Sequence, residues 1–360
     1  MVASLPRIAV LGHGLFGSAL CDLFEDAGLR VKAWDPNATV PDHRAASDIQ
    51  ELLASAQWII LAMPVEAQPK ALETIRPLLS SQQTVLDVGS VKVHPERLMN
   101  ECLGNEIPWV ATHPLFGPAS LARGERPLRV VICPNPQHPS AVEEVESLFR
   151  TIGCTVIQQS AETHDRAMAE AHALGFFIAK GLLDTGASFE SDVVPPSAQG
   201  LSRLIHAVRI DAGHLLGTLN RQNPFAPALR KELIASLVAL DDALDHGASE
   251  SLEIEAELQI PDLGKRSKDL QVTRNLIDDV DRQLLGLLAQ RARLSERAGA
   301  AKEAIGVGVR DPKRETDMRS KRRDWAVELG LDPEGADAVF GAILRASRAL
   351  QLTGSSAEKE

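Results

Sequence analysis

The sequence predicts an α/β domain built on a parallel sheet, followed by two all-helical domains. Short, continuously apolar runs recur between residues 8 and 157, and helix-periodic segments separate them. Runs that are apolar on both faces are typical of parallel strands covered by helices. From about His164 the strand signals stop, and apolar residues then recur with the helical period.

The chain begins with a strand, a glycine-rich turn and a helix. An apolar run at residues 8–11 precedes Gly12, Gly14 and Gly17, which have G-x-G-x-x-G spacing. A helix-periodic segment follows, and then a second strand that ends at Asp35. This order is the fingerprint of a Rossmann-like dinucleotide-binding domain. The glycines allow a tight turn, close approach of a pyrophosphate and close helix–strand packing, and the helix N-terminus supplies N–H donors for the phosphates.

Asp35 indicates which dinucleotide is bound. It lies 18 residues after Gly17, where a carboxylate can bond a ribose 2′-OH and would repel a 2′-phosphate. The sequence therefore predicts NAD rather than NADP, and the alternative is a glycine-rich turn without a ligand. The expected cofactor-binding residues are Gly12, Gly14, Leu15, Phe16, Gly17, Asp35 and Met63.

Further apolar runs complete this domain, which we expect to span residues 1–160. They cover residues 58–63, 84–88, 109–112, 129–133 and 155–157. Ligands of parallel α/β sheets bind beyond the carboxyl ends of the strands. Met63, Ser90 and His113 lie at these ends, so we expect them on the cofactor's side of the sheet.

A second domain is predicted at residues 161–250. Its helices are expected over residues 164–183, 201–219 and 227–244. The apolar faces of these helices are wide. We therefore expect the domain to join two copies of the chain in a homodimer.

A third domain is predicted at residues 270–353, after a connector at residues 251–269. Its first helix, over residues 270–305, is about 50 Å long. A helix of this length needs partner helices, which we expect from a second chain. A charged helix from Pro312 and a last helix over residues 336–351 complete the domain, and residues 354–360 are expected to be a disordered tail.

The composition argues against several classes of protein. The net charge of −11 argues against general nucleic-acid binding, and the absence of any run of 18 apolar residues argues against a membrane span. The first strand begins too close to Met1 to leave room for a signal peptide. The cysteines have no metal-ligand spacing, so we expect reduced thiols, no metal and a cytoplasmic protein; they are Cys21, Cys102, Cys133 and Cys154.

His113 is the candidate general base of the first half. A neutral imidazole can take a proton from an alcohol while hydride leaves to NAD. Ser90, at the neighbouring strand end, is placed to orient that alcohol. The alternative is a structural histidine at the end of a strand.

Three motifs after the fingerprint resemble those of prephenate dehydrogenases. They are Gly-Ser-Val-Lys at 89–92, Thr-His-Pro-Leu-Phe-Gly-Pro at 112–118 and Thr-His-Asp at 163–165, and the resemblance covers about residues 6–250. It implies that His113 accepts the proton of the prephenate ring hydroxyl, which Ser90 also bonds, while hydride passes to NAD. Loss of CO2, driven by aromatisation, then gives 4-hydroxyphenylpyruvate.

The same resemblance implies that an arginine of the helical domain holds a substrate carboxylate, which its bidentate fork fits. Arg209 is the expected residue, and Arg203 on the same predicted helix is its rival. Three further residues are secondary candidates that we expect to be structural or to lie at the rim, namely Lys92, His172 and His206.

The long helix carries cations in a distinct pattern. Arg291 and Lys302 are 11 residues apart, almost three turns, and therefore share one face. Arg274 lies 17 residues before Arg291 and points about 100° away around the axis. Inward-facing cations are costly unless an anion neutralises them, so the pattern indicates a dianionic ligand. The alternative is a row of arginines on a solvated surface.

This pattern resembles the all-helical chorismate mutases, without a gap over residues 274–315 and again at residues 347–351. The resemblance implies that Arg291 and Arg274, the latter from the other subunit, bind the two carboxylates of chorismate. It also implies that Lys302 and Gln351 bond the ether oxygen. The remaining pocket residues are Asp311, Arg314, Glu315 and Ser347. Because the reaction is a pericyclic rearrangement, catalysis rests on positioning and electrostatic preorganisation.

The two halves fit one route to tyrosine, because the mutase product, prephenate, is the substrate of the dehydrogenase. The sequence therefore predicts a bifunctional enzyme that converts chorismate to prephenate and prephenate to 4-hydroxyphenylpyruvate. One alternative has 4-amino-4-deoxy analogues or arogenate as the substrates. Another makes the C-terminal domain a non-catalytic dimerising or sensor domain.

Overall fold

The computed structural model describes residues 7–54, 56–187, 194–210, 214–246, 270–306 and 311–354. The chain divides into two compact units. The first comprises Met1–Pro118 and Pro127–Glu255, and the second comprises Ala119–Arg126 and Ala256–Glu360. Within the described ranges, no helix combines the length and hydropathy that a membrane span requires. The predicted domain boundary at residue 160 stays a prediction.

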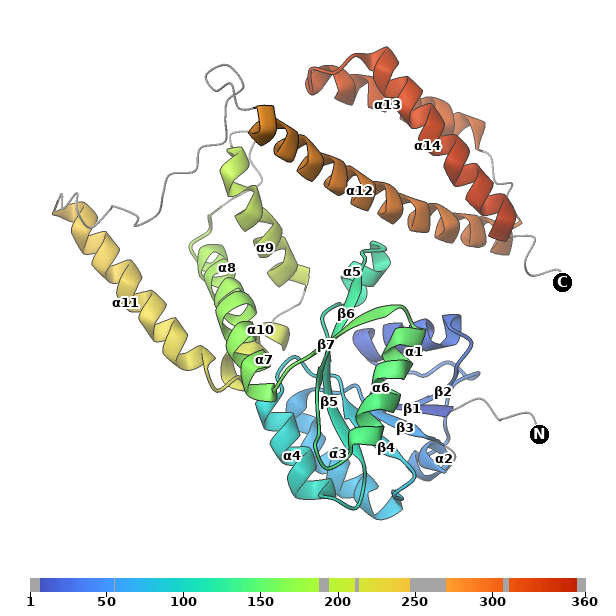
Figure 1. Ribbon diagram of the computed structural model, residues 1–360, viewed down its shortest axis with the longest axis vertical. Helices are drawn as coiled ribbons and strands as arrows, with labels where there is room; N and C mark the ends of the chain where they lie inside the picture. The colour runs from blue at the N-terminus through green and yellow to red at the C-terminus, as the bar shows by residue number, and fades with distance from the viewer. Residues whose placement is uncertain are drawn as a thin grey trace. The chain divides into compact units, whose positions relative to one another are not determined.

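A seven-stranded sheet forms the centre of the first unit (Figure 1). Its strand order is β2-β1-β3-β4-β5-β6-β7, and the first five strands pair in parallel. Each strand matches a predicted apolar run to within two residues at either end. The strands are β1 (Arg7–Leu11), β2 (Arg30–Trp34), β3 (Trp58–Leu61), β4 (Thr84–Asp87), β5 (Trp109–Pro114), β6 (Leu128–Cys133) and β7 (Cys154–Gln158).

Strand β6 runs antiparallel to β5, so the expectation of a parallel sheet is wrong at this edge. The segment between the two strands carries only the five-residue helix α5 (Pro118–Ala122). A parallel neighbour needs a crossover connection, usually a helix packed on the sheet, whereas antiparallel neighbours need only a turn. His113 lies near the carboxyl end of β5, on the same edge of the sheet as the carboxyl ends of β3 and β4.

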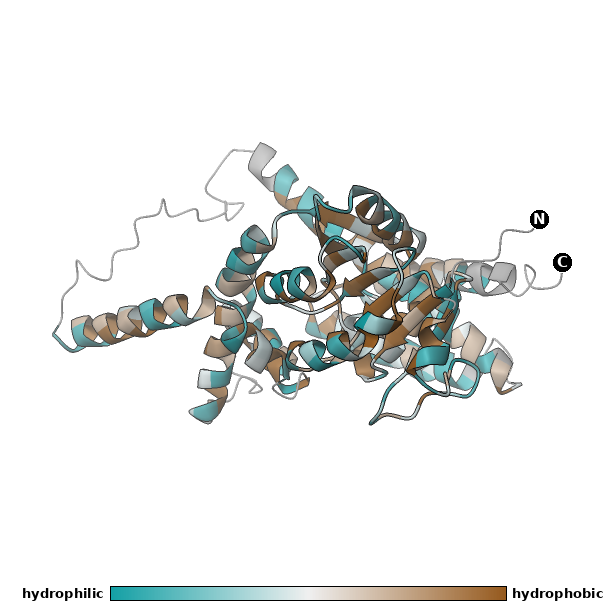
Figure 2. Ribbon diagram, turned by 90° about the horizontal axis from the view of Figure 1, so that it is seen from below, coloured by the Kyte–Doolittle hydropathy of each residue, from teal (hydrophilic) through white to brown (hydrophobic). Residues whose placement is uncertain are grey.

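Helices cover both faces of the sheet. Alternate strand residues such as Leu11 and Ile59 belong to one buried core cluster, together with residues of α2, α3 and α4. The intervening residues Val10 and Ile60 are equally buried, as a doubly covered sheet requires. Figure 2 shows the strands in brown, in keeping with their apolar sequence. The helices between strands are α1 (Leu15–Asp26), α2 (Ile49–Leu53), α3 (Gln68–Ile75), α4 (Val93–Leu103) and α6 (Pro139–Thr151), with 3-10 turns at Val65–Ala67 and Arg76–Leu78.

The helical part of the first unit packs on the loops that follow β3 and β4. Val65 and Val91 from these loops share a buried cluster with Ala169, Leu219 and Ala226 of the helices. The predicted helix over residues 201–219 corresponds to α9 and α10, and residues 211–213 of that prediction lie outside the described residues. The elements are α7 (Ala161–Met168), a π-helical turn (Ala169–Ala173), α8 (Leu174–Asp184), a 3-10 turn (Pro196–Ala198), α9 (Gln199–Ile210), α10 (His214–Arg221) and α11 (Ala226–Asp245).

The second unit consists of three helices and a short segment from earlier in the chain. Helix α14 (Pro333–Gly354) packs against both α12 (Leu270–Ala304) and α13 (Pro312–Glu328). Residues 119–126 lie along α12, where Arg293 Nε and Arg297 Nη1 donate to the carbonyls of Gly124 and Ala122 at 2.8 and 2.6 Å. The predicted connector and tail fall outside the described residues, apart from Gly354.

Candidate active sites

The turn after β1 is crowded at two of its glycines and open at the third. Gly12 has φ +102°, and a Cβ there would lie 2.4 Å from the Ala62 carbonyl oxygen. A Cβ on Gly17 would lie 2.1 Å from the carbonyl oxygen of Gly12. Gly14 is the N-cap of α1, and among the described residues nothing beyond its own chain neighbours lies within 4 Å of where its Cβ would be. An opening at a helix N-terminus is what a pyrophosphate needs, so the turn fits a dinucleotide.

Asp35 follows β2 directly and is bonded back to this turn. Its Oδ2 accepts the backbone N–H of His13 at 2.6 Å, and its Oδ1 accepts those of Asn37 and Ala38. Burial alone would raise the pKa of Asp35, but these donors outweigh burial and hold the pKa below its usual range. The carboxylate is therefore anionic at neutral pH and fixed beside the glycine turn.

Other residues predicted to bind the cofactor also lie around the turn. The backbone nitrogen of Met63 lies 3.2 Å from where a Cβ on the first fingerprint glycine would be. The ring of Phe16, in the first turn of α1, lies 6.2 Å from the ring of Phe116. Leu15 is 84% exposed. Because Phe116 belongs to the motif that contains His113, the fingerprint and the candidate base are close to each other.

His113 is a buried histidine that contacts a second one. It is 6% exposed, and its Nδ1 lies 2.8 Å from Nε2 of His164 on α7. The other ring nitrogen of His164 lies 2.8 Å from a carboxylate oxygen of Asp165. Burial first, and then the neighbouring His164, Lys92 and His172, lower the pKa of His113 well below its usual range. Its imidazole is therefore neutral at neutral pH, the form that a general base needs.

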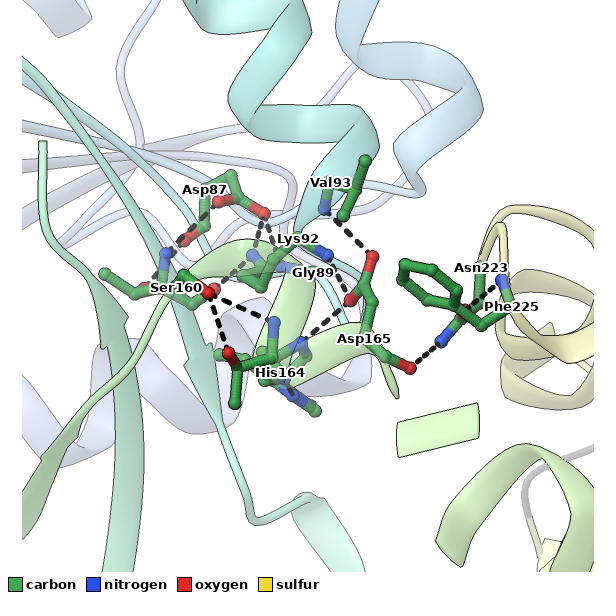
Figure 3. A network of polar contacts seen from close by, with 12 residues as sticks. Asp87, Gly89, Lys92, Val93, Ser160, His164, Asp165, Asn223 and Phe225 are labelled. Atoms are coloured by element: carbon green, nitrogen blue, oxygen red, sulfur yellow. Dashed lines mark hydrogen bonds and ion pairs between the residues drawn. The ribbon is translucent and has the colours of Figure 1, made fainter. Parts of the chain in front are cut away.

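A fully buried ion pair supports the ends of β4 and β5 (Figure 3). Lys92 Nζ donates to the carboxylate of Asp87 and to the carbonyl oxygen of Thr112, the neighbour of His113. Removing the ammonium group would leave Asp87 as an uncompensated buried charge, at a cost of about 3–5 kcal/mol. This geometry supports the structural role expected for Lys92.

The other predicted residues of the first half lie further from this network. Ser90 is half-buried, three residues beyond the end of β4. Arg203 and Arg209 are both exposed on α9 and, at six residues apart, point about 120° away from each other. Only one of these arginines can therefore face a given ligand. His206 is exposed on the same helix, and His172 lies in the π-helical turn, where burial lowers its pKa.

A second polar site joins α12 and α14. Arg291 Nη1 donates to Ser347 Oγ at 2.6 Å, and Ser347 is 8% exposed. Burial first, and then the nearby Arg322, lower the pKa of Arg291. A partly buried guanidinium beside another cation is stabilised when an anion binds, so this site fits the expected carboxylate ligand.

The start of α13 contributes three predicted residues. Asp311 is the N-cap of this helix, and its Oδ1 accepts the backbone N–H of Arg314 at 3.0 Å. Glu315 accepts a hydrogen bond of 2.6 Å from Arg348 on α14. Asp311, Arg314 and Glu315 therefore lie within one turn, and bonds to the backbone and to α14 hold them there.

The remaining predicted mutase residues lie far apart along the chain. Arg274 is exposed near the start of α12, and Lys302 is half-buried in its last turn. Because α12 is one uninterrupted helix, Arg274 lies about 25 Å from Arg291 and about 40 Å from Lys302 along the axis. Within one chain, no small ligand spans that distance. Gln351 belongs to α14, and its side chain lies outside the described residues.

Two family models match the chain. The model of the prephenate dehydrogenase nucleotide-binding domain matches residues 31–158, and the model of chorismate mutase type II matches residues 273–352. The chain carries a prephenate dehydrogenase domain and a chorismate mutase domain. His113 lies within the residues that the first model matches, and Arg291 lies within those that the second model matches.

Individual relatives resemble the dehydrogenase part. The cyclohexadienyl dehydrogenase of Zymomonas mobilis is 28% identical over 201 residues, which are 51% of this chain and 68% of that protein. The 4-amino-4-deoxyprephenate dehydrogenase of Streptomyces pristinaespiralis is 26% identical, over 62% of this chain and 74% of that protein. The crystal structure of prephenate dehydrogenase from A. aeolicus, in complex with hydroxyphenyl propionate and NAD+, shares the fold. Its TM-score is 0.53, at 18% identity over 70% of this chain and 95% of that one.

No role was predicted for four polar residues that the structure brings together behind His113. They are Asp87, His164, Asp165 and Asn223. Asn223 Nδ2 donates to the backbone carbonyl of Asp165 at 2.7 Å. For the first three of these residues, the sequence has a feature from which a role could have been predicted. His164 and Asp165 form the Thr-His-Asp motif, and Asp87 ends an otherwise apolar strand.

Proposed function

We propose that this chain is a bifunctional enzyme that rearranges chorismate to prephenate and converts prephenate, with loss of CO2, to 4-hydroxyphenylpyruvate. One observation carries the proposal. The chain has two separate polar sites, each within a domain that the corresponding family model matches. Since the mutase product is the dehydrogenase substrate, the two sites serve consecutive steps.

In the dehydrogenase, His113 takes the proton of the ring hydroxyl. Its neutral, buried imidazole supports this role, because a base must be unprotonated when the substrate binds. Ser90 bonds the same hydroxyl and so orients it toward His113. Arg209, or its rival Arg203, holds a carboxylate of the substrate through a bidentate fork.

We propose NAD as the cofactor of this step, where it supplies the hydride acceptor. The open cradle at Gly14 suits the pyrophosphate. The anionic carboxylate of Asp35, fixed beside the glycine turn, suits a free ribose 2′-OH and opposes a 2′-phosphate.

In the mutase, the protein supplies position and charge rather than a nucleophile. Arg291 and the partner subunit's Arg274 hold the two carboxylates, and Lys302 and Gln351 donate to the ether oxygen as negative charge grows there. The pocket is completed by Asp311, Arg314, Glu315 and Ser347. The length of α12 between Arg274 and Arg291 supports a site shared between two chains.

A homodimer follows from this arrangement. Large apolar side chains on α12, such as Ile277 and Leu284, are about half exposed in the single chain. We also propose a cytoplasmic location, which the four free cysteines support.

The decisive experiment supplies the pure protein with NAD and chorismate and follows NADH. We expect NADH to form, and Lys302→Ala to abolish this while leaving NADH formation from added prephenate unchanged. Lys321→Ala, on the exposed surface of α13, is the matched control and should leave both rates unchanged. If the wild type makes NADH from prephenate but not from chorismate, the C-terminal domain is a sensor or dimeriser.

A second candidate substrate is favoured by one relative. Because a 4-amino-4-deoxyprephenate dehydrogenase aligns with 62% of this chain, the amino analogues remain rivals of the hydroxyl substrates. Competition between prephenate, its 4-amino analogue and arogenate would rank the substrates by kcat/KM. A higher kcat/KM for an amino compound would overturn the preference for prephenate.

A further inference from the structure

A line of three buried side chains leads from the dehydrogenase base into the core. Nδ1 of His113 lies 2.8 Å from Nε2 of His164. Nδ1 of His164 lies 2.8 Å from Oδ1 of Asp165. His164 and Asp165 are both 0% exposed, so water does not reach these bonds. The two histidine rings meet edge to face, 5.0 Å apart.

Asp165 fixes the direction of these hydrogen bonds. Its Oδ1 accepts the backbone N–H of Lys92 at 2.7 Å, and its Oδ2 accepts that of Val93 at 2.9 Å (Figure 3). These donors are the first N–H groups of α4, where the helix dipole favours a negative charge. The carboxyl group therefore acts as an acceptor, and His164 must donate to it from Nδ1.

The donor at Nδ1 determines the rest of the line. A neutral His164 with its proton on Nδ1 has a lone pair on Nε2, so His113 must donate its own Nδ1–H to it. The Nε2 of His113 is then left without a proton. That nitrogen is the one free to take a proton from a substrate.

We propose that His164 and Asp165 are positioning residues, which hold His113 in the tautomer that leaves Nε2 as the base and which offset the positive charge that His113 gains. This deepens the function proposed above and rests on His113 being the base there. The arrangement extends the logic of a catalytic triad, in which a buried carboxylate orients a histidine, by a second histidine.

The proposed reaction places a positive charge on His113, and the residues behind it affect the stability of that charge. When the substrate O–H bond breaks and the proton joins His113 Nε2, the ring becomes a cation while hydride leaves to NAD. After CO2 leaves, the proton returns to the oxygen of the aromatic product. His164, Lys92 and His172 all lower the pKa of His113 and so oppose a positive charge on its ring. The carboxylate of Asp165, which is bonded to His164, favours that charge.

A spectroscopic test uses the wild-type protein and does not depend on turnover. In protein labelled with ¹⁵N-histidine, nitrogen shifts report which ring nitrogen carries the proton, and His113→Asn and His164→Gln assign the two rings. We expect both rings to be Nδ1–H tautomers at neutral pH. An Nε2–H tautomer of His113, or a doubly protonated His164, would overturn the proposal.

A kinetic test separates positioning from packing. His164→Leu keeps the volume apolar and removes the acceptor, so we expect kcat to fall by roughly 10²–10⁴-fold with little change in KM for prephenate or NAD. His164→Gln keeps an acceptor near the position of Nε2 and should recover kcat to within about tenfold of the wild type. Gln83→Leu is the control, because it also removes a buried, hydrogen-bonded side chain, and it precedes β4 at the edge of the sheet opposite to His113.

The outcomes are distinct. A folded His164→Leu with near-normal kcat, or equal losses in the leucine and glutamine variants with raised KM, would show that His164 only packs the core. If His164→Leu does not fold, the tautomers of the wild type still decide. Wild-type protein that shows the expected tautomers but does not oxidise prephenate would count against the proposed function and leave the hydrogen-bond order standing.

Discussion

The glycines of the first turn are required for different reasons, some by the protein's own backbone and one by a bound ligand. Gly12 and Gly17 are required by the protein's own backbone, since a methyl group on either would lie within 2.4 Å of a carbonyl oxygen. Gly14 has no such neighbour, so only a bound ligand would require it to be glycine. The same loop therefore contains two glycines that the fold requires and one, Gly14, for which we propose a role in cofactor binding.

Gly14→Ala should leave the fold intact and weaken cofactor binding. We expect the free energy of unfolding to change by no more than about 0.5 kcal/mol, as for a surface substitution without a clash. KM for NAD should rise by about tenfold or more, because the methyl group occupies the space of the pyrophosphate, a loss of ~1.4 kcal/mol. Thermal unfolding and steady-state kinetics measure both effects. Gly181→Ala on α8 is the control, because among the described residues a Cβ at Gly181 would also have no close neighbour. An unchanged KM for NAD in Gly14→Ala would contradict a pyrophosphate site at Gly14.

The buried His113 predicts the pH dependence of the dehydrogenase. Its pKa lies well below that of an exposed histidine, so the acid limb of kcat/KM should lie well below pH 6.5. The mutase rate should stay nearly flat around neutrality, because Gln351 is neutral and has no group that titrates. An acid limb of the dehydrogenase at pH 6.5 or above would show that His113 is not held neutral.

The same shift has a consequence for stability. Below about pH 6.5 the unfolded chain binds a proton at His113 that the folded chain does not bind. Stability from this residue is therefore full above pH 6.5 and is lost as the pH falls toward the lowered pKa. Thermal unfolding against pH should show this loss in the wild type and a smaller one in His113→Asn.

At the scale of elements, helix α12 exposes a stripe of large apolar side chains in the single chain. It is 35 residues long, and Ile277, Val280 and Leu284, spaced to share one face, are 53%, 53% and 50% exposed. An apolar stripe of this kind is stabilised only when another surface covers it. The helix also separates Arg274 from Arg291, so the second copy that we propose would supply both the covering surface and the second arginine.

Leu284→Glu should disrupt this dimer and the mutase together. A carboxylate buried in the interface costs several kcal/mol, so we expect a large shift toward monomer. Mutase activity should fall with dissociation, because Arg274 of the partner subunit is lost. Light scattering during size-exclusion chromatography and a chorismate assay measure the two effects.

Arg282→Gln is the matched control for this variant. It changes the charge of the helix by the same single unit, and it lies about 200° around the axis from Leu284. Its exposed ion pair with Asp279 contributes at most about 1 kcal/mol, so the dimer and the mutase rate should both be retained. A stable dimer of Leu284→Glu would contradict this interface.

At the scale of the whole molecule, two reactions are assigned to two separate units of one chain. The dehydrogenase residues belong to the first unit, and the mutase residues belong to the second. Each site has its own polar network, and no described residue is assigned to both. Prephenate made at one site is a small dianion that water solvates well, so it can pass between molecules.

A mixture of two inactive variants should therefore recover the coupled reaction. Lys302→Ala lacks the mutase and His113→Asn lacks the dehydrogenase, so neither alone should make NADH from chorismate. Mixed together with NAD, they should make NADH after a lag, because prephenate released by the second variant reaches the first. Absorbance at the NADH band follows the time course. A mixture that stays silent, although each variant retains its other activity, would show that prephenate does not leave the chain on which it forms.

Much of this protein was determined by the sequence itself, because the signals are local. Strand positions follow from contiguous apolar runs, and the glycine fingerprint with Asp35 follows from spacing within one βαβ unit. Helix α12 and the spacing of its cations follow from the helical period of its own sequence, independently of other elements. Both domains were therefore predictable, including the motifs that their family models match.

Only the tertiary structure decided what depends on residues that are distant in the chain. The direction of β6 and the buried pair of Lys92 with Asp87 are not encoded by any local pattern. The line from His113 to Asp165 spans 52 residues of sequence, and its direction follows from backbone donors of α4. Hydrogen bonds of this kind form only after the sheet and the helices have packed. That is why the sequence predicts His113 as a candidate base, whereas only the structure shows that His164 and Asp165 are bonded behind it.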